Sequence, residues 1–140
     1  MRFMIIVKAT QDSEDGAMPS EALIAKMTAY HEELAQAGVL VDASGLQPSS
    51  RGWRIRYEGE KRSFVDGPFT ETKELIAGYT LIEVASREEA VTWTRRFPNP
   101  AIDGGEGEIE VRPVFDLDDF EPSESVERFR SLAEEFRASR

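Results

Sequence analysis

Residues 78–84 read Gly-Tyr-Thr-Leu-Ile-Glu-Val, and this stretch decides the fold. Aromatic and β-branched residues favour a strand, in which alternate side chains point to opposite faces. Tyr79 and Leu81 then lie on one face, and Ile82 and Val84 on the other. Because both faces carry apolar groups, this strand is expected to be covered on both sides.

The start of the chain predicts a second strand of the same kind. Within residues 2–9, Phe3 and Ile5 alternate with Met4 and Ile6, so again neither face is polar. The segment is too short for a membrane span or a signal peptide, which leaves an internal strand as the interpretation. These two strands therefore need a packing layer on each face of the sheet.

Working outward from these strands, periodicity and capping residues predict a complete order of elements. The expected elements are a strand at 2–9, a polar loop at 10–18, a helix from Ser20 to Gly38, a strand at 39–46, a hairpin at 53–65 turning at Gly59, a short helical turn at 70–74, a strand at 78–84, a helix at 86–97, an acidic glycine-rich loop at 103–107, a last strand at 109–115 and a helix after 121. This is the α+β class: a ferredoxin-like βαββαβ-type subunit with an inserted hairpin.

The number of helices implies a homodimer. Two core helices cover one face of the sheet, so the apolar groups on the other face need a second layer. Pairing sheet against sheet with an identical subunit supplies it, forming a dimeric α/β-barrel. We expect a domain at 1–120 and an amphipathic helical extension at 121–140, packed on its own subunit or on its partner.

Composition narrows the function classes. The formal net charge of −10 disfavours nucleic acid and anionic membranes as partners, since both need a basic face. The chain has no cysteine and one histidine, which excludes disulfides, thiol catalysis and a typical zinc site and suits a cytoplasmic protein. Neither a phosphate loop nor a dinucleotide motif is present, so no metal and no cofactor are expected.

One motif carries a resemblance to a known family. Residues 66–79 read Asp-Gly-Pro-Phe-Thr-Glu-Thr-Lys-Glu-Leu-Ile-Ala-Gly-Tyr, flanked by Gly-Leu-Gln-Pro-Ser-Ser at 45–50 and Ser-Arg-Glu-Glu-Ala at 86–90. Over residues 1–120 the chain resembles the DGPF-domain branch of the YCII-related family. The resemblance implies a dimeric α/β-barrel. It also implies a regulatory link to extracytoplasmic-function sigma factors and, from the parent group, a His–Asp acid/base pair.

His31 and Asp66 are the candidate catalytic residues. His31 is the only histidine, beside core-facing Tyr30 on the first long helix, and its ordinary pKa suits proton transfer. Asp66 ends a hairpin strand, where a carboxylate serves as a base or orients a histidine. The structural alternatives are a packing histidine and an Asx turn. Contact between the side chains of His31 and Asp66 would favour the catalytic interpretation over the structural one.

The other candidates form a ligand-binding set around the motif. Gly67 and Pro68 set the turn, and Phe69 anchors it in the core or in the dimer interface. A pocket or a salt bridge between subunits explains the charged residues equally well, and arginines on the hairpin are suited to an anionic ligand. These charged candidates are Glu71, Lys73, Glu74, Arg54 and Arg56.

These observations lead to two hypotheses. The first is a homodimeric small-molecule-binding or regulatory domain, with its pocket between sheet and helices near Asp66, His31 and Lys73. The alternative is a cofactor-free acid/base enzyme, of the isomerase or lyase kind, that uses the Asp66–His31 pair.

Overall fold

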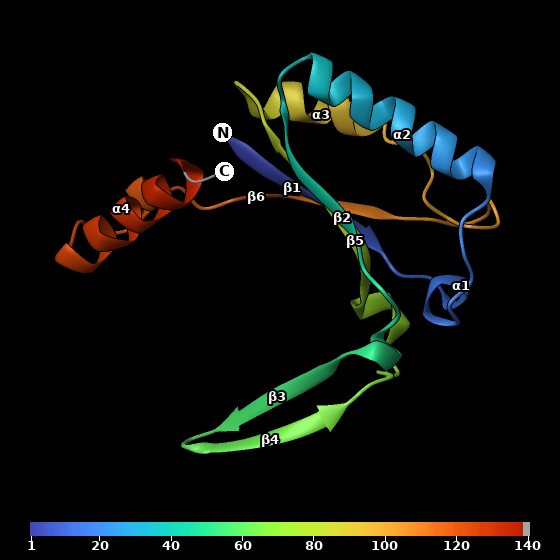
Figure 1. The fold of residues 1–140 in the computed structure, drawn as a ribbon, viewed down its shortest axis with the longest axis horizontal. Coiled ribbons are helices and arrows are strands. Elements are labelled where there is room, and N and C mark those ends of the chain that lie inside the picture. Colours follow the sequence, from blue (N-terminus) through green and yellow to red (C-terminus); the bar gives the residue numbers. More distant parts are fainter. Residues whose placement is uncertain (139–140) are drawn as a thin grey trace.

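A computed structural model describes residues 1–138; the last two positions of the predicted 121–140 extension lie outside the described residues (Figure 1). Its elements, in chain order, are β1 (Arg2–Lys8), α1 (Gln11–Glu14), α2 (Glu21–Gln36), β2 (Leu40–Gly45), η1 (Ser49–Arg51), β3 (Trp53–Glu58), β4 (Lys61–Asp66), η2 (Thr72–Glu74), β5 (Ile76–Glu83), α3 (Arg87–Arg95), β6 (Ile109–Pro113), η3 (Leu117–Asp119) and α4 (Glu124–Ala138). The α, β and hairpin elements predicted from the sequence are all present.

The central sheet has four strands in the order β2-β5-β1-β6, and every neighbouring pair is antiparallel. The two strands predicted to be apolar on both faces, β1 and β5, are therefore the inner pair. Ile5 lies opposite Thr80 and Ile6 opposite Tyr79. Because side chains alternate along a strand, this register decides on which face of the sheet each side chain of β1 and β5 lies. The hairpin β3–β4 is a separate two-stranded sheet.

Helices α2 and α3 both lie on one face of this sheet (Figure 1). Ser20 and Ser86 begin them, each accepting a hydrogen bond from a backbone amide three residues on. Gly38, with φ of 75°, follows α2 in the left-handed conformation that glycine adopts readily. The core between helices and sheet consists of Phe3, Ile5, Tyr30, Leu34, Val39, Ile82, Val84 and Ala90.

The opposite face of the sheet has neither helix against it. Met4, Ile6 and Leu81 point there and are half-buried by their neighbours in the sheet. We call this surface the open face. It lines a concave space that the hairpin bounds on one side and α4 on another (Figure 1).

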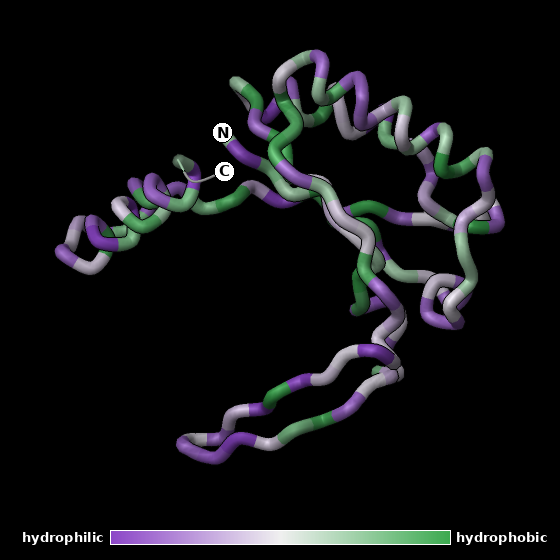
Figure 2. The backbone as a smooth tube through the Cα atoms, in the orientation of Figure 1, coloured by the Kyte–Doolittle hydropathy of each residue, from purple (hydrophilic) through white to green (hydrophobic). Residues whose placement is uncertain are grey.

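The hairpin and α4 extend away from the core. Apolar positions occur along both (Figure 2), yet no residue of α4 and none of the two hairpin strands is buried. No helix within residues 1–138 is long and apolar enough to cross a membrane.

Two local predictions were wrong. The segment 10–18, predicted as a loop, contains α1, because Thr10 and Ser13 cap one another's backbone and start a helical turn. The last strand ends at Pro113, so Phe115 lies beyond it and is exposed.

Candidate functional site

The Asp-Gly-Pro-Phe segment forms the bend between the hairpin and the sheet. The amide of Gly67 donates to the carbonyl of Gly52, and the Gly67–Pro68 peptide is cis. A Cβ on Gly67 would lie 1.8 Å from the carbonyl oxygen of Ser49, so only glycine fits at this close approach. The motif therefore has a structural role in this chain: it sets the direction of the hairpin.

A hydrogen-bond network braces this bend from outside the motif. The backbone amide and the hydroxyl of Ser49 both donate to one carboxylate oxygen of Glu14, each at 2.9 Å. The amide of Phe69 in turn donates to the Ser49 hydroxyl at 3.1 Å. The guanidinium of Arg54 lies 3.7 Å from the centre of the Phe69 ring. Phe69 and Arg54 thus contact each other at the base of the hairpin.

His31 lies between α2 and the sheet, on the helix-covered side. Its Nδ1 is 2.7 Å from the carbonyl oxygen of Met27, and its Nε2 is 2.8 Å from the hydroxyl of Thr80. The ring also meets the edges of Tyr30 and Phe97. Both ring nitrogens therefore have partners within the subunit.

Asp66 is exposed at the end of β4, opposite Trp53 in the hairpin. Within residues 1–138 it forms no hydrogen bond or ion pair with His31, whose partners are Met27 and Thr80. The structure thus does not bring the two candidate catalytic side chains together in one subunit.

The charged candidates are all exposed. Glu71, Lys73 and Glu74 are exposed around η2, and within residues 1–138 they form no ion pair. Arg56 is exposed on β3, on the same hairpin face as Arg54. No three His, Cys, Asp or Glu side chains of the described chain are clustered as metal ligands.

The open face carries a polar pair that sequence reasoning missed. The phenol of Tyr79 on β5 donates to Oδ2 of Asp42 on β2 at 2.8 Å, and the amide of Ala43 donates to Oδ1. The pair has apolar neighbours toward the centre of the sheet, because Leu81 lies opposite Asp42 and Ile6 opposite Tyr79, whereas Ser44 lies opposite Tyr79 on the edge strand β2. Both residues were visible in predicted strands, but only the β2–β5 pairing places them together.

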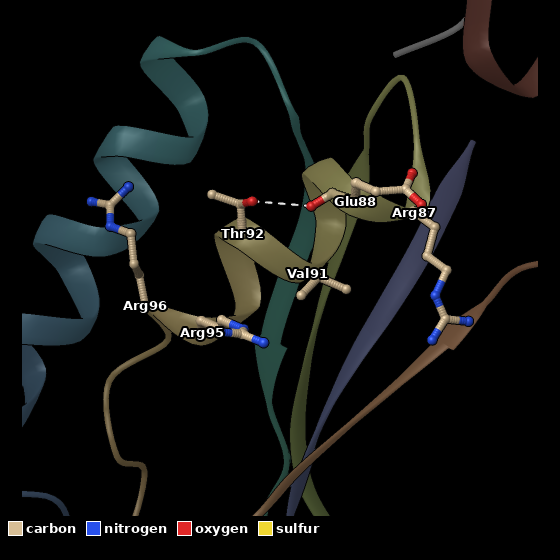
Figure 3. Close-up of a pocket in the computed structure, with 6 residues that line it drawn as sticks. All are labelled: Arg87, Glu88, Val91, Thr92, Arg95 and Arg96. Carbon is tan, nitrogen blue, oxygen red and sulfur yellow. Dashed lines mark hydrogen bonds between the residues drawn. The ribbon is translucent and has the colours of Figure 1, made fainter.

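Two shallow hollows lie against α3. The first, about 460 Å³, is lined by Val91 and Arg95 among others, and its Arg96 points toward α2 (Figure 3). The second, about 270 Å³, lies between α3 and the β1–β6 edge and includes Phe3 and Val111. Neither contains a residue of the predicted ligand-binding set.

Tyr30, in the helix–sheet layer, has a strongly shifted pKa. Burial raises the pKa of Tyr30 to about 12, with Arg96 opposing the shift and Glu33 adding to it. Its hydroxyl donates to the carbonyl of Trp93 at 2.8 Å. This tyrosine is therefore a neutral, structural donor at ordinary pH.

Comparisons with known proteins agree with the sequence motif. Residues 1–118 match the family model of the YCII-related domain. An uncharacterised protein of Rhizobium meliloti (strain 1021) is 32% identical over 94 residues, which cover 67% of this chain and 74% of that protein.

A solved structure, the 5-chloro-2-hydroxyhydroquinone dehydrochlorinase from Burkholderia phenoliruptrix AC1100 in complex with 2,5-dihydroxybenzoquinone, is similar at a TM-score of 0.44 and 16% identity. The similarity covers 82% of this chain and 94% of that one. A likeness this distant carries no argument about chemistry.

Proposed function

The chain belongs to the YCII-related family, and on this premise we propose that it is a homodimeric small-molecule-binding domain of the DGPF type with a regulatory role. The observation that carries the proposal is the open face of the sheet. Its half-buried apolar side chains lie beside the hydrogen-bonded pair Asp42–Tyr79, and neither core helix covers them.

The strand order supports a ferredoxin-like subunit that pairs through its sheet. An antiparallel β2-β5-β1-β6 order with both core helices on one side leaves the other side for a second copy. In such a pair, two open faces enclose a space lined by Met4, Ile6 and Leu81 of each subunit. Burial of this surface is favourable at roughly 25 cal/mol per Å² before association costs.

We place the ligand over Asp42 and Tyr79. The carboxylate has lone pairs beyond the two bonds it accepts, and the phenol oxygen is able to accept a further bond. A small molecule with a hydroxyl or amino donor on an apolar body suits this combination, because its body would pack on Ile6 and Leu81. The site therefore lies on the opposite side of the sheet from the pocket expected near His31.

The test combines oligomeric state with ligand binding. Sedimentation at low micromolar concentration is expected to give a dimer. A thermal-shift screen of small molecules is expected to give hits that Tyr79→Phe and Asp42→Ala both weaken, while Tyr57→Phe on the exposed hairpin does not. The proposal would be overturned if the protein were a monomer in dilute solution with α4 packed over the open face. It would also be overturned if both site variants gave the same ligand-induced thermal shifts as wild type.

The acid/base enzyme that uses Asp66 and His31 has weaker support. His31 has both ring nitrogens engaged within its own subunit, and Asp66 lies on a different part of the fold. The family's link to extracytoplasmic-function sigma factors belongs to the regulatory proposal. Its direct test is co-sedimentation of the dimer with such a factor, with and without a screened ligand.

A further inference from the structure

The hairpin β3–β4 has one aromatic face that nothing within residues 1–138 of its own subunit covers. Cross-strand pairing places Ile55 opposite Phe64 and Tyr57 opposite Arg62, with Trp53 on the same side. Trp53 and Phe64 stack at 6.0 Å, yet they are 61% and 60% exposed. Large aromatic side chains gathered on one exposed surface are typical of an interaction site.

Helix α4 presents a second uncovered apolar surface. Val126, Phe129 and Leu132 follow one another at helical spacing on one side of the helix. Phe129 and Leu132 are 61% and 60% exposed, and Arg130 ties the helix only to Asp118 and to Glu127 of the helix itself. The helix also lies beyond residues 1–118, which match the family domain.

Within one chain these two surfaces do not meet. Figure 1 views the molecule down its shortest axis, and it shows α4 and the hairpin on different sides of the concave space before the open face. A second subunit seated in that space would lie between them. In a two-fold symmetric dimer, α4 of each subunit then contacts the hairpin of the other. The same contact occurs twice, and the assembly ends at two subunits.

The two surfaces match in length, and the aromatic face carries one base that suits the acids of α4. A helix of 15 residues is roughly 22 Å long, and hairpin strands of 6 residues are roughly 20 Å long. Of the bases of the hairpin, Arg62 lies on the aromatic face, opposite Tyr57, and forms no ion pair in the described chain. The other bases, Arg54, Arg56 and Lys61, lie on the opposite face of the hairpin. Helix α4 bears the acids Glu124, Glu134 and Glu135, which are equally unpaired within residues 1–138.

We propose that α4 of each subunit packs its apolar side on the aromatic face of the partner's hairpin, so that the two arms clasp the dimer. This inference rests on the proposed homodimer and names the partner of both arms as a second copy of this chain. It gives the residues after 120 a function that the family domain does not supply: they lock the pair from outside the sheets.

Because the chain has no cysteine, engineered pairs report the contact cleanly. Chains carrying Trp53→Cys or Tyr57→Cys are mixed, after subunit exchange, with chains carrying Phe129→Cys or Leu132→Cys, and oxidised mildly. Disulfide formation requires Cα atoms within about 7 Å. We expect at least one mixed pair to give a covalent dimer at least about fivefold faster than Arg56→Cys or Ser131→Cys controls, which point away from the proposed contact.

A second measurement uses chains without cysteine. Phe129→Ser combined with Leu132→Ser is expected to raise the dimer dissociation constant about tenfold or more, while Arg128→Ser leaves it nearly unchanged. The inference fails if sedimentation shows a dimer but no mixed pair cross-links. It also fails if a chain that carries one cysteine on the hairpin and one on α4 forms only an intramolecular disulfide. A wild-type monomer would instead refute the proposed function, so the two failures are distinguishable.

Discussion

Nε2 of His31 lies 2.8 Å from the hydroxyl of Thr80, across the boundary between α2 and the middle of β5. Since the carbonyl of Met27 only accepts, Nδ1 donates to it, and in the tautomer that carries its proton on Nδ1 alone, Nε2 accepts the hydrogen of Thr80. Thr80 is 2% exposed, so its hydroxyl has no water as an easy substitute for His31. The only histidine of the chain thus joins helix to sheet.

Thr80→Val is therefore expected to destabilise the protein. Valine keeps the shape of threonine but leaves Nε2 of His31 without its donor, which costs about 1–3 kcal/mol in the free energy of unfolding. Urea denaturation measures the loss. Thr92→Val, on the exposed side of α3, removes a hydroxyl that only bonds its own helix and should change stability by less than about 0.5 kcal/mol. Equal losses for the two variants would contradict the role given to the buried pair.

Gly67→Ala is expected to disturb the bend at the base of the hairpin. The added Cβ would lie 1.8 Å from the Ser49 carbonyl oxygen and 2.7 Å from its carbon, so backbone must move. We expect a loss of about 2 kcal/mol or more, together with a change in tryptophan fluorescence from Trp53. Gly45→Ala is the control, because its Cβ meets nothing within 4 Å and its φ is ordinary. A fully stable Gly67→Ala protein would show that the bend tolerates a side chain.

The sequence predicted the order of elements well because capping and periodicity act locally. Ser20, Gly38 and Ser86 mark helix ends through bonds to their own neighbours, and the structure places them there. The faces of β1 and β5 also followed from simple alternation. The short helix α1 was missed because its capping pair, Thr10 and Ser13, has no apolar stripe behind it.

The candidate site was harder to predict, because it depends on strand pairing. Asp66 and Lys73 belong to one motif but lie on different elements, β4 and η2. Asp42 and Tyr79, far apart in the sequence, meet because β2 pairs with β5. The motif that carries the family resemblance holds Gly67, which the bend requires.

Tyr30 gives a prediction about alkaline pH. Its folded-state pKa is about 12, above the ordinary value of 10.0, so the folded protein keeps this proton while the unfolded chain loses it. The resulting stability is fully present below pH 10 and declines as pH rises from about 10 to 12, by roughly 1–3 kcal/mol.

Tyr30→Phe removes this titration, although it also loses the bond to Trp93 and so starts from lower stability. The unfolding free energy, measured from about pH 9 to about pH 11.5, should fall less steeply with rising pH for Tyr30→Phe than for wild type. This range covers most of the interval between the unfolded and folded pKa values of Tyr30. Tyr57→Phe, at a tyrosine that is 65% exposed, should keep the wild-type slope. Parallel slopes for wild type and Tyr30→Phe would rule out burial of the neutral phenol as the cause.

A charge on the open face tests the homodimer directly. Ile6 lies opposite Tyr79 on one side and Glu110 on the other, in the middle of the surface that we assign to the partner. Ile6→Glu would place a carboxylate between two sheets, where desolvation and the symmetry-related charge both oppose association. We expect the dissociation constant to rise about 100-fold or more, with circular dichroism unchanged.

Two further chains separate dissociation from damage to the subunit. Val91→Glu, on the exposed side of α3, adds the same charge away from the sheet and should leave the dimer intact. Mixing Ile6→Glu chains with Ile6→Lys chains should restore association, because opposite charges then face each other across the two-fold axis. A subunit harmed by the substitution would not recover on mixing, whereas an Ile6→Glu chain that sediments as a wild-type dimer would mean that the sheets do not face each other.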